Sequence, residues 1–156
     1  MLAALESSQR DISPQVERIL AEEKKKGLMV EKTYRAFQAR VEKIRDQLLR
    51  FLQDCKQTGK KVVAYGAAAK GNTLLNYAGV TSDLLPYVCD AAPSKQGKYL
   101  PGSRIPIVPP QVLAPDAPDF ILILPWNIAG EVVAQNRPLL PAKTRFVTCV
   151  PEMKDW

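Results

Sequence analysis

The feature that most constrains the fold of this chain is a turn of small residues directly after a short apolar run. The run 61–65 reads Lys-Val-Val-Ala-Tyr, and the turn 66–72 reads Gly-Ala-Ala-Ala-Lys-Gly-Asn. An apolar run that ends at glycine predicts a buried strand, and the segment 72–77 is expected to be helical until Gly79. A strand, a glycine turn and a helix together begin a βαβ unit.

The rest of the second half repeats this alternation of strands and helices. We expect strands at 85–89, 104–108, 120–124 and 145–150, a helical turn at 110–113 and a helix at 128–140. The run 120–124 is the most apolar of the chain and therefore predicts a central strand, buried on both faces. Right-handed crossovers between parallel strands then give a Rossmann-like α/β domain over 60–156, an open parallel sheet with helices on both faces.

The first 59 residues follow a different pattern, with one proline against twelve after residue 85. Ser13-Pro14 predicts a capped helix start, and Gly27 predicts its end after a helix over 14–26. A second helix is expected over 31–57, with Gly59 beyond its end. The region 1–59 is thus predicted to be an N-terminal helical pair that packs on the domain.

The apolar residues of the second helix form a seam with alternating spacings of three and four. They are Tyr34, Phe37, Val41, Ile44, Leu48, Phe51 and Cys55. This spacing is typical of coiled coils. It favours packing against the chain's own first helix and sheet. It also leaves open a missing domain or a second subunit, as in a homodimer through 34–55.

The composition excludes several classes of function. The chain has no histidine and no Cys-x-x-Cys pair, so we expect no metal site within it. Cys55, Cys89 and Cys149 are predicted to be buried free thiols, which fits a cytoplasmic protein. The net charge of +6 is spread without clusters, so nucleic-acid binding is not expected and a small anionic ligand suits it better.

Neither a membrane partner nor an export signal is expected. No apolar run approaches the about 20 residues needed to span a bilayer. The segment 1–6, Met-Leu-Ala-Ala-Leu-Glu, is too short and too soon charged for a signal peptide.

Unusual residues gather where the predicted strands end, which is the ligand-binding edge of an open parallel sheet. In the first turn the candidates for phosphate contact are Gly66, Ala67, Lys70, Gly71 and Asn72. The turn lacks the middle glycine of the dinucleotide fingerprint and the Gly-Lys-Ser/Thr of a P-loop. A helix N-terminus with small residues and a lysine nevertheless suits an anion. The alternative is a tight turn needed only for helix–sheet packing.

The next two strand ends supply further candidates. Asp90 ends the second strand, where an acid binds a ribose hydroxyl in dinucleotide folds, or simply caps a turn. The long loop that follows offers Lys95 and Tyr99 for phosphate, base or sugar contact, or is a solvated basic loop. Trp126 and Asn127 suit stacking and hydrogen bonding to a ligand. Alternatively, Trp126 packs at a domain interface and Asn127 caps a helix.

No catalytic residue is predicted in the chain. Histidine, the usual general base, is absent, and the few carboxylates of the second half form no obvious pair. The chain therefore has the character of a binding domain.

Four separated segments form an ordered set of motifs. They are 65–77 (Tyr-Gly-Ala-Ala-Ala-Lys-Gly-Asn-Thr-Leu-Leu-Asn-Tyr), 95–102 (Lys-Gln-Gly-Lys-Tyr-Leu-Pro-Gly), 105–107 (Ile-Pro-Ile) and 121–127 (Ile-Leu-Ile-Leu-Pro-Trp-Asn). Together with upstream matches at 13–14, 27–28 and 33–37, they resemble the C-terminal domain of the S-adenosylmethionine-dependent C-methyltransferases. That family includes the sugar C-methyltransferases of deoxysugar and antibiotic biosynthesis.

The resemblance implies a three-domain enzyme that methylates a carbon beside the keto group of a nucleotide-linked sugar. It places zinc in an N-terminal domain and S-adenosylmethionine in a central domain, both absent from this chain. The C-terminal domain would help to hold the nucleotide-sugar. The chain departs from the family at Ala91-Ala92, where Arg-Asn is usual, and at Ser103-Arg104, where Thr-His is usual.

Two other functions stay open from the sequence. One is a stand-alone nucleotide-binding or regulatory module that dimerises through 34–55. The other is an oxidoreductase with a nicotinamide cofactor, against which the incomplete glycine pattern argues.

Overall fold

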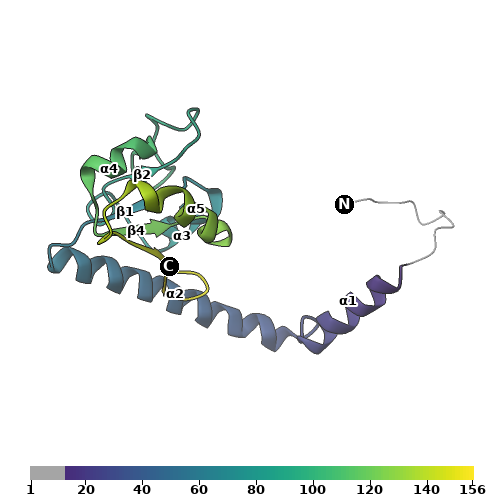
Figure 1. The fold of residues 1–156 in the computed structure, drawn as a ribbon. Coiled ribbons are helices and arrows are strands. Elements are labelled where there is room, and N and C mark those ends of the chain that lie inside the picture. Colours follow the sequence, from purple (N-terminus) through teal and green to yellow (C-terminus); the bar gives the residue numbers. More distant parts are fainter. Residues whose placement is uncertain (1–12) are drawn as a thin grey trace. The chain divides into compact units, whose positions relative to one another are not determined.

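The structure, a computed structural model, describes residues 13–156 and divides into two compact units (Figure 1). The first unit ends at Arg40, and the second covers Val41–Trp156. The helix α2 (Glu31–Gln57) begins in the first unit and ends in the second, so the boundary falls inside a continuous helix. The segment 1–6, for which the sequence predicts no signal peptide, lies outside the described residues.

The first unit contains α1 (Pro14–Lys25), a tight turn and the beginning of α2. The predicted cap is confirmed, because Ser13 Oγ accepts a hydrogen bond of 3.3 Å from the Gln15 amide. The predicted stop is confirmed as well. Backbone hydrogen bonds of 3.0 and 3.1 Å close a Schellman motif around Gly27, whose φ is +72°.

The second unit is built on one six-stranded sheet. Its strands are β1 (Val62–Tyr65), β2 (Val88–Cys89), β3 (Ile107–Val108), β4 (Phe120–Ile123), β5 (Arg145–Thr148) and β6 (Lys154–Asp155). Their order is β3-β2-β1-β4-β5-β6, and the first five strands run parallel. This is the strand order of a Rossmann fold. The predicted α/β fold is therefore confirmed, and β4 is a fully buried inner strand as expected.

Helices cover both faces of the sheet, as predicted. The further helices are α3 (Ala69–Tyr77), α4 (Leu113–Asp116) and α5 (Ala129–Asn136), with 3₁₀ turns at Pro110–Val112, Trp126–Ile128 and Arg137–Leu139. One core cluster joins α2 and α3 to alternate strand residues such as Ala64 and Leu122. The other cluster joins α4 and α5 to the intervening strand residues, such as Val63 and Ile121. The period-two alternation of the strands thus divides the core into two layers.

The structure differs from the sequence predictions at several element boundaries and in one additional strand. The strand expected over 85–89 is reduced to β2, and α3 begins at Ala69 rather than at residue 72. The helix expected over 128–140 ends as a 3₁₀ turn that contains Pro138, because proline cannot donate the next helical hydrogen bond. The antiparallel strand β6 was not predicted, since two exposed charged residues carry no apolar signal.

The second half of α2 packs onto the sheet. Leu48, Leu52 and Cys55 are buried in the same cluster as the strands, and Phe51 meets Phe120 edge to face at 5.1 Å between ring centroids. At the other end of the seam, Tyr34 and Phe37 are each 58% exposed. Only part of the seam is therefore used within the second unit.

The described residues contain neither a membrane-spanning helix nor a metal-ligand cluster. No helix in residues 13–156 is long and apolar enough to cross a membrane. The same residues contain no group of three or more cysteine, aspartate or glutamate side chains placed to hold a metal ion.

Candidate functional site

The candidate site lies at the carboxyl edge of the sheet, where β1, β2 and β4 end. Each strand is followed at this edge by a residue singled out from the sequence: Gly66 after β1, Asp90 after β2 and the turn 125–127 after β4. Since β1 lies between β2 and β4, these three ends are neighbours. The strand order reverses at β1, and ligands bind at such a switch point in open α/β sheets.

The two glycines of the first turn both allow close packing. Gly66 has φ of +88°, and a Cβ placed on it would lie 2.5 Å from Pro125 Cδ. A Cβ on Gly71 would lie 2.5 Å from the Cβ of Leu124. The turn is therefore tight because α3 sits directly against the end of β4. These glycines have a structural role whether or not a ligand approaches them.

The N-terminus of α3 carries no side-chain cap. Its N-cap residue is Ala68, which has no hydrogen-bonding side chain. The first amides of a helix need acceptors from outside it, and the positive end of the helix dipole favours an anion. This end of α3 therefore has no acceptor from its own cap residue. The phosphate contact predicted for 66–72 stays a prediction.

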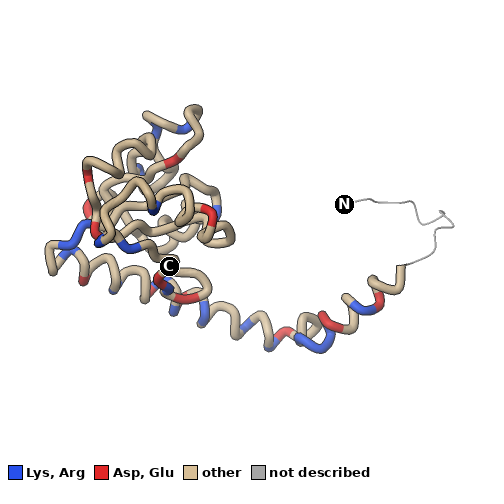
Figure 2. Tube along the Cα trace, viewed as in Figure 1, with Lys and Arg blue, Asp and Glu red and all other residues tan. Residues whose placement is uncertain are grey.

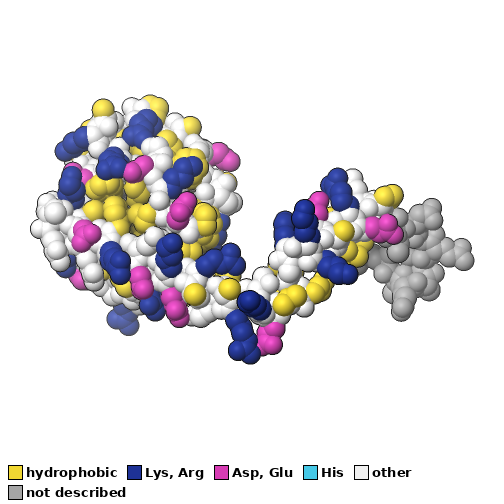
Figure 3. Space-filling model, turned by 90° about the horizontal axis from the view of Figure 1, so that it is seen from below, with side chains coloured by type: hydrophobic (Ala, Val, Ile, Leu, Met, Phe, Trp, Pro, Cys, Tyr) yellow, Lys and Arg dark blue, Asp and Glu magenta, His cyan; other side chains and the backbone are white. Residues whose placement is uncertain are grey.

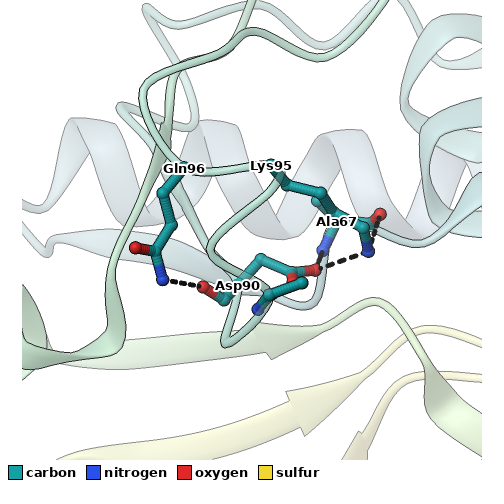
Figure 4. Close-up of polar contacts among 5 residues, drawn as sticks. Ala67, Asp90, Lys95 and Gln96 are labelled. Carbon is teal, nitrogen blue, oxygen red and sulfur yellow. Dashed lines mark hydrogen bonds and ion pairs between the residues drawn. The ribbon is translucent and has the colours of Figure 1, made fainter.

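Asp90 connects the glycine turn to the loop that follows β2 (Figure 4). Its Oδ2 accepts hydrogen bonds from the Ala67 amide at 2.7 Å and from Lys95 Nζ at 3.0 Å. Its Oδ1 accepts from the Ala92 amide at 2.8 Å, and its main-chain oxygen accepts from Gln96 Nε2 at 2.9 Å. We call these five residues the Asp90 network. The loop and the turn are thereby held together.

Burial and hydrogen bonding act in opposite directions on Asp90. Burial raises the pKa of its carboxyl group, because the residue as a whole is only 7% exposed. Hydrogen bonds from Ala92, Lys95 and Ala67 outweigh burial and hold that pKa below its ordinary value. Asp90 is thus a charged structural acceptor in this conformation. Its predicted contact with a ribose hydroxyl stays a prediction.

A second group joins α3 to the end of β4. Lys70 Nζ lies 4.5 Å from the centroid of the Trp126 ring and donates a hydrogen bond to Asn127 Oδ1. We call these three residues the Lys70 group. Asn127 caps neither of the adjacent helical turns, whose N-cap residues are Pro125 and Ile128. The structure therefore brings together three of the predicted site residues across two strand ends.

Asn72 and Tyr99 take less central positions. The Oδ1 atom of Asn72 is buried and has no hydrogen-bond partner. Tyr99 is 65% exposed and forms an antiparallel bridge with Pro106, just before β3. The structure does not bring Tyr99 into either polar group.

Sequence reasoning missed part of this arrangement. Gln96 and the amide of Ala92 belong to the Asp90 network, and Lys95 also donates to the main-chain oxygen of Ala67 at 3.0 Å. Lys95 was predicted to contact ligand, whereas here it is engaged within the protein. The polar segment Lys-Gln-Gly-Lys at 95–98 could have indicated Gln96, since polar groups that become buried need hydrogen-bond partners.

Other ionisable groups do not extend the site. Lys61 and Tyr87 both bond to Asp116 at the opposite edge of the sheet, where β1 and β2 begin. Burial raises the pKa of the Cys89 thiol to about 12 and that of the Cys149 thiol to about 11. Because little thiolate forms at neutral pH, neither the Cys89 nor the Cys149 thiol is a ready nucleophile.

Fold and site define a Rossmann-type α/β domain with a candidate anion-binding edge. Comparison with known proteins assigns it further. The family model for the C-methyltransferase C-terminal domain matches residues 1–151, and the chain belongs to this family. It is 38% identical over 152 residues to C-methyltransferase NovU from Streptomyces niveus. The match covers 97% of this chain and 36% of NovU, so the chain spans about a third of that relative.

Proposed function

We propose that the chain is the substrate-holding C-terminal domain of an S-adenosylmethionine-dependent C-methyltransferase, with a nucleotide-linked keto-sugar as its ligand. One observation carries this proposal. In a member of this family, the uncapped start of α3, the Lys70 group and the Asp90 network meet at one edge of the sheet. That edge offers an anion site beside an aromatic ring, which are the two contacts a nucleoside diphosphate requires.

Each part of the edge has a role in this proposal. The free amides of α3 and the ammonium group of Lys70 bind the diphosphate. The indole of Trp126 packs against a ring of the ligand, and Asn127 offers an amide for hydrogen bonding. The Asp90 network holds the long loop in place beside the turn.

The methyl transfer itself is assigned to the rest of the enzyme. The chain has no histidine, and the Asp90 carboxylate at this edge is engaged by Lys95 and two backbone amides. The described residues include no metal-ligand cluster. We propose that the methyl donor, the base and zinc belong to the portion that corresponds to the unmatched part of NovU. The cytoplasm is the proposed setting, since such substrates and donors are made there.

Calorimetric titration of the full chain with nucleoside 5′-diphosphates and with inorganic pyrophosphate tests the proposal. We expect the nucleoside diphosphates to bind more tightly than pyrophosphate, because they also contact Trp126. Lys70→Met should weaken nucleoside diphosphate binding about tenfold, the loss of one charge-assisted contact. Lys43→Met is the matched control on an exposed face of α2 and should bind as the wild type does.

Two results would count against this function. The first is that the folded chain binds no nucleoside diphosphate at millimolar concentration. The second is that Lys43→Met and Lys70→Met have equal effects. Binding of S-adenosylmethionine by the chain alone would instead contradict the assignment of the methyl donor to another domain.

A further inference from the structure

The helices of the first unit expose a large apolar surface. Within residues 13–40 no side chain is buried, although α1 carries Val16, Ile19 and Leu20 at spacings of three and four. These spacings place the three side chains on one face of the helix. Figure 3 shows hydrophobic side chains open to solvent along these helices, between charged ones. Among the described residues of the first unit, none buries the apolar face of α1.

Apolar side chains of the turn and of the start of α2 are exposed as well. Met29 and Val30 are 69% and 53% exposed, and Tyr34 and Phe37 follow them. Farther along the same helix, Leu48 and Leu52 are fully buried by the sheet. One seam is thus covered in its second half and open in its first half.

Such a surface indicates a partner on energetic grounds. The helix α1 has 12 residues, a length at which an isolated helix is marginal in water. Amphipathic helices in proteins gain their stability by burying the apolar face. A contiguous exposed patch of large apolar side chains marks an interaction site. We define the docking face as Val16, Ile19, Leu20, Tyr34 and Phe37.

A second copy of the chain fits this surface poorly. The open part of the seam holds only two turns of exposed residues, whereas a coiled coil needs about three or four heptads. With Tyr34 at position a, Arg40 falls at position g and Arg45 at the following position e. A parallel pair would place these arginines opposite each other across the interface, which is repulsive.

The family relationship indicates another occupant. The match to NovU covers 97% of this chain, so it includes these helices, and it leaves about two thirds of NovU outside. The family model describes a C-terminal domain and matches from residue 1. The helices therefore stand at the end of the domain that adjoins the rest of such an enzyme. Acidic and basic residues both occur along these helices (Figure 2), which suits a protein surface better than a polyanion.

We propose that the docking face binds the methyltransferase part of the enzyme. The inference rests on the proposed function, because that function supplies the partner. It adds that residues 13–40 are covered by the methyltransferase part rather than by a second copy of the chain.

The test compares the chain alone with a chimera that joins the chain to the unmatched part of NovU. Hydrogen exchange of residues 13–40 should be fast in the chain alone, which should sediment as a monomer. Exchange of the same residues should slow about tenfold or more in the chimera, as expected for a covered helix. Phe37→Glu should abolish this protection, whereas Ala39→Glu, an exposed position on the opposite side of α2, should leave it intact.

Folding is checked separately from docking. Phe37 is exposed, so Phe37→Glu should leave the Tm of the second unit unchanged in the chain alone. Fast exchange of residues 13–40 in the chimera would overturn the proposal. A concentration-dependent dimer that Phe37→Glu dissociates would overturn it in favour of a second copy. If the docking proposal fails but the chain still binds nucleoside diphosphates, the proposed function stands. If the chain does not bind them, the proposed function fails.

Discussion

Lys95 donates one hydrogen bond to the Asp90 carboxylate and another to the main-chain oxygen of Ala67, both at 3.0 Å. Ala67 in turn donates its amide to the same carboxylate oxygen of Asp90. The ammonium group thus closes a ring of contacts between the ends of β1 and β2. The position of the loop over the glycine turn depends on these charges.

The first prediction concerns the substitution Asp90→Asn. The neutral amide can accept fewer of the three hydrogen bonds, and Lys95 loses its counter-charge beside a buried group. We expect the free energy of unfolding to fall by about 1–3 kcal/mol in denaturant titrations. Asp54→Asn, at an exposed position on α2, is the control and should change it by less than about 0.5 kcal/mol. Equal effects of the two substitutions would refute the structural role of the carboxylate.

The second prediction follows from the lowered pKa of Asp90. A group whose pKa is lower in the folded state contributes full stability above its unfolded pKa of about 3.9. That contribution is lost as the pH falls below this value toward the folded pKa. The stability difference between wild type and Asp90→Asn should therefore be constant from pH 5 to 7 and shrink below about pH 4. Asp116, whose pKa is also lowered, contributes equally to the stability of both proteins, so its contribution cancels in the difference between them. A difference that is independent of pH would argue against the charged network.

The fold was largely predictable because its determinants are local and repeated. The apolar run of β4 and the stops at Gly27 and Gly59 each gave an element in the expected place. The misplaced boundaries have a different origin. The start of α3 at Ala69 depends on packing against Leu124, which no local pattern reports. Similarly, β6 exists only because it pairs with β5.

The candidate site was predictable as a place but not as a set of contacts. The rule that parallel strands end at one edge of the sheet predicted that Lys70, Asp90 and Trp126 lie at the same edge, and they do. Which of them are free for a ligand depends on distances across the fold. Lys95 and Asp90 satisfy each other, and this pairing could not be derived from their separation by five residues. The outward direction of Tyr99 was equally unpredictable.

The third prediction concerns the three cysteine thiols. Burial raises the pKa of Cys149 to about 11 and of Cys89 to about 12, and it also raises that of Cys55. Little thiolate is present at pH 8, so the native chain should react slowly with a disulfide reagent. Cys55, which is 7% exposed, should give the fastest phase, and Cys55→Ser should remove it. All three thiols should react at once in denaturant. Immediate reaction of Cys89 or Cys149 in the native chain would contradict their burial.

The fourth prediction asks whether Gly71 serves the packing of α3 on β4 or the approach of a ligand. Alanine has a higher helix propensity than glycine by about 1 kcal/mol, so Gly71→Ala would stabilise an unpacked helix. Here the new Cβ would lie 2.5 Å from the Cβ of Leu124, which cannot swing away as the end of a flexible side chain could. We expect a net loss of about 1–3 kcal/mol in the free energy of unfolding, because α3 must shift off β4.

Gly130→Ala provides the matched control for this prediction. Gly130 is also helical, but the nearest atom to its added Cβ is Trp156 Cζ3 at 3.9 Å, an ordinary contact. The substitution should be neutral or stabilising by up to about 1 kcal/mol. If Gly71→Ala were equally well tolerated but weakened nucleoside diphosphate binding, Gly71 would serve ligand approach rather than packing. A loss of stability at Gly71 alone assigns the glycine to the contact between α3 and β4.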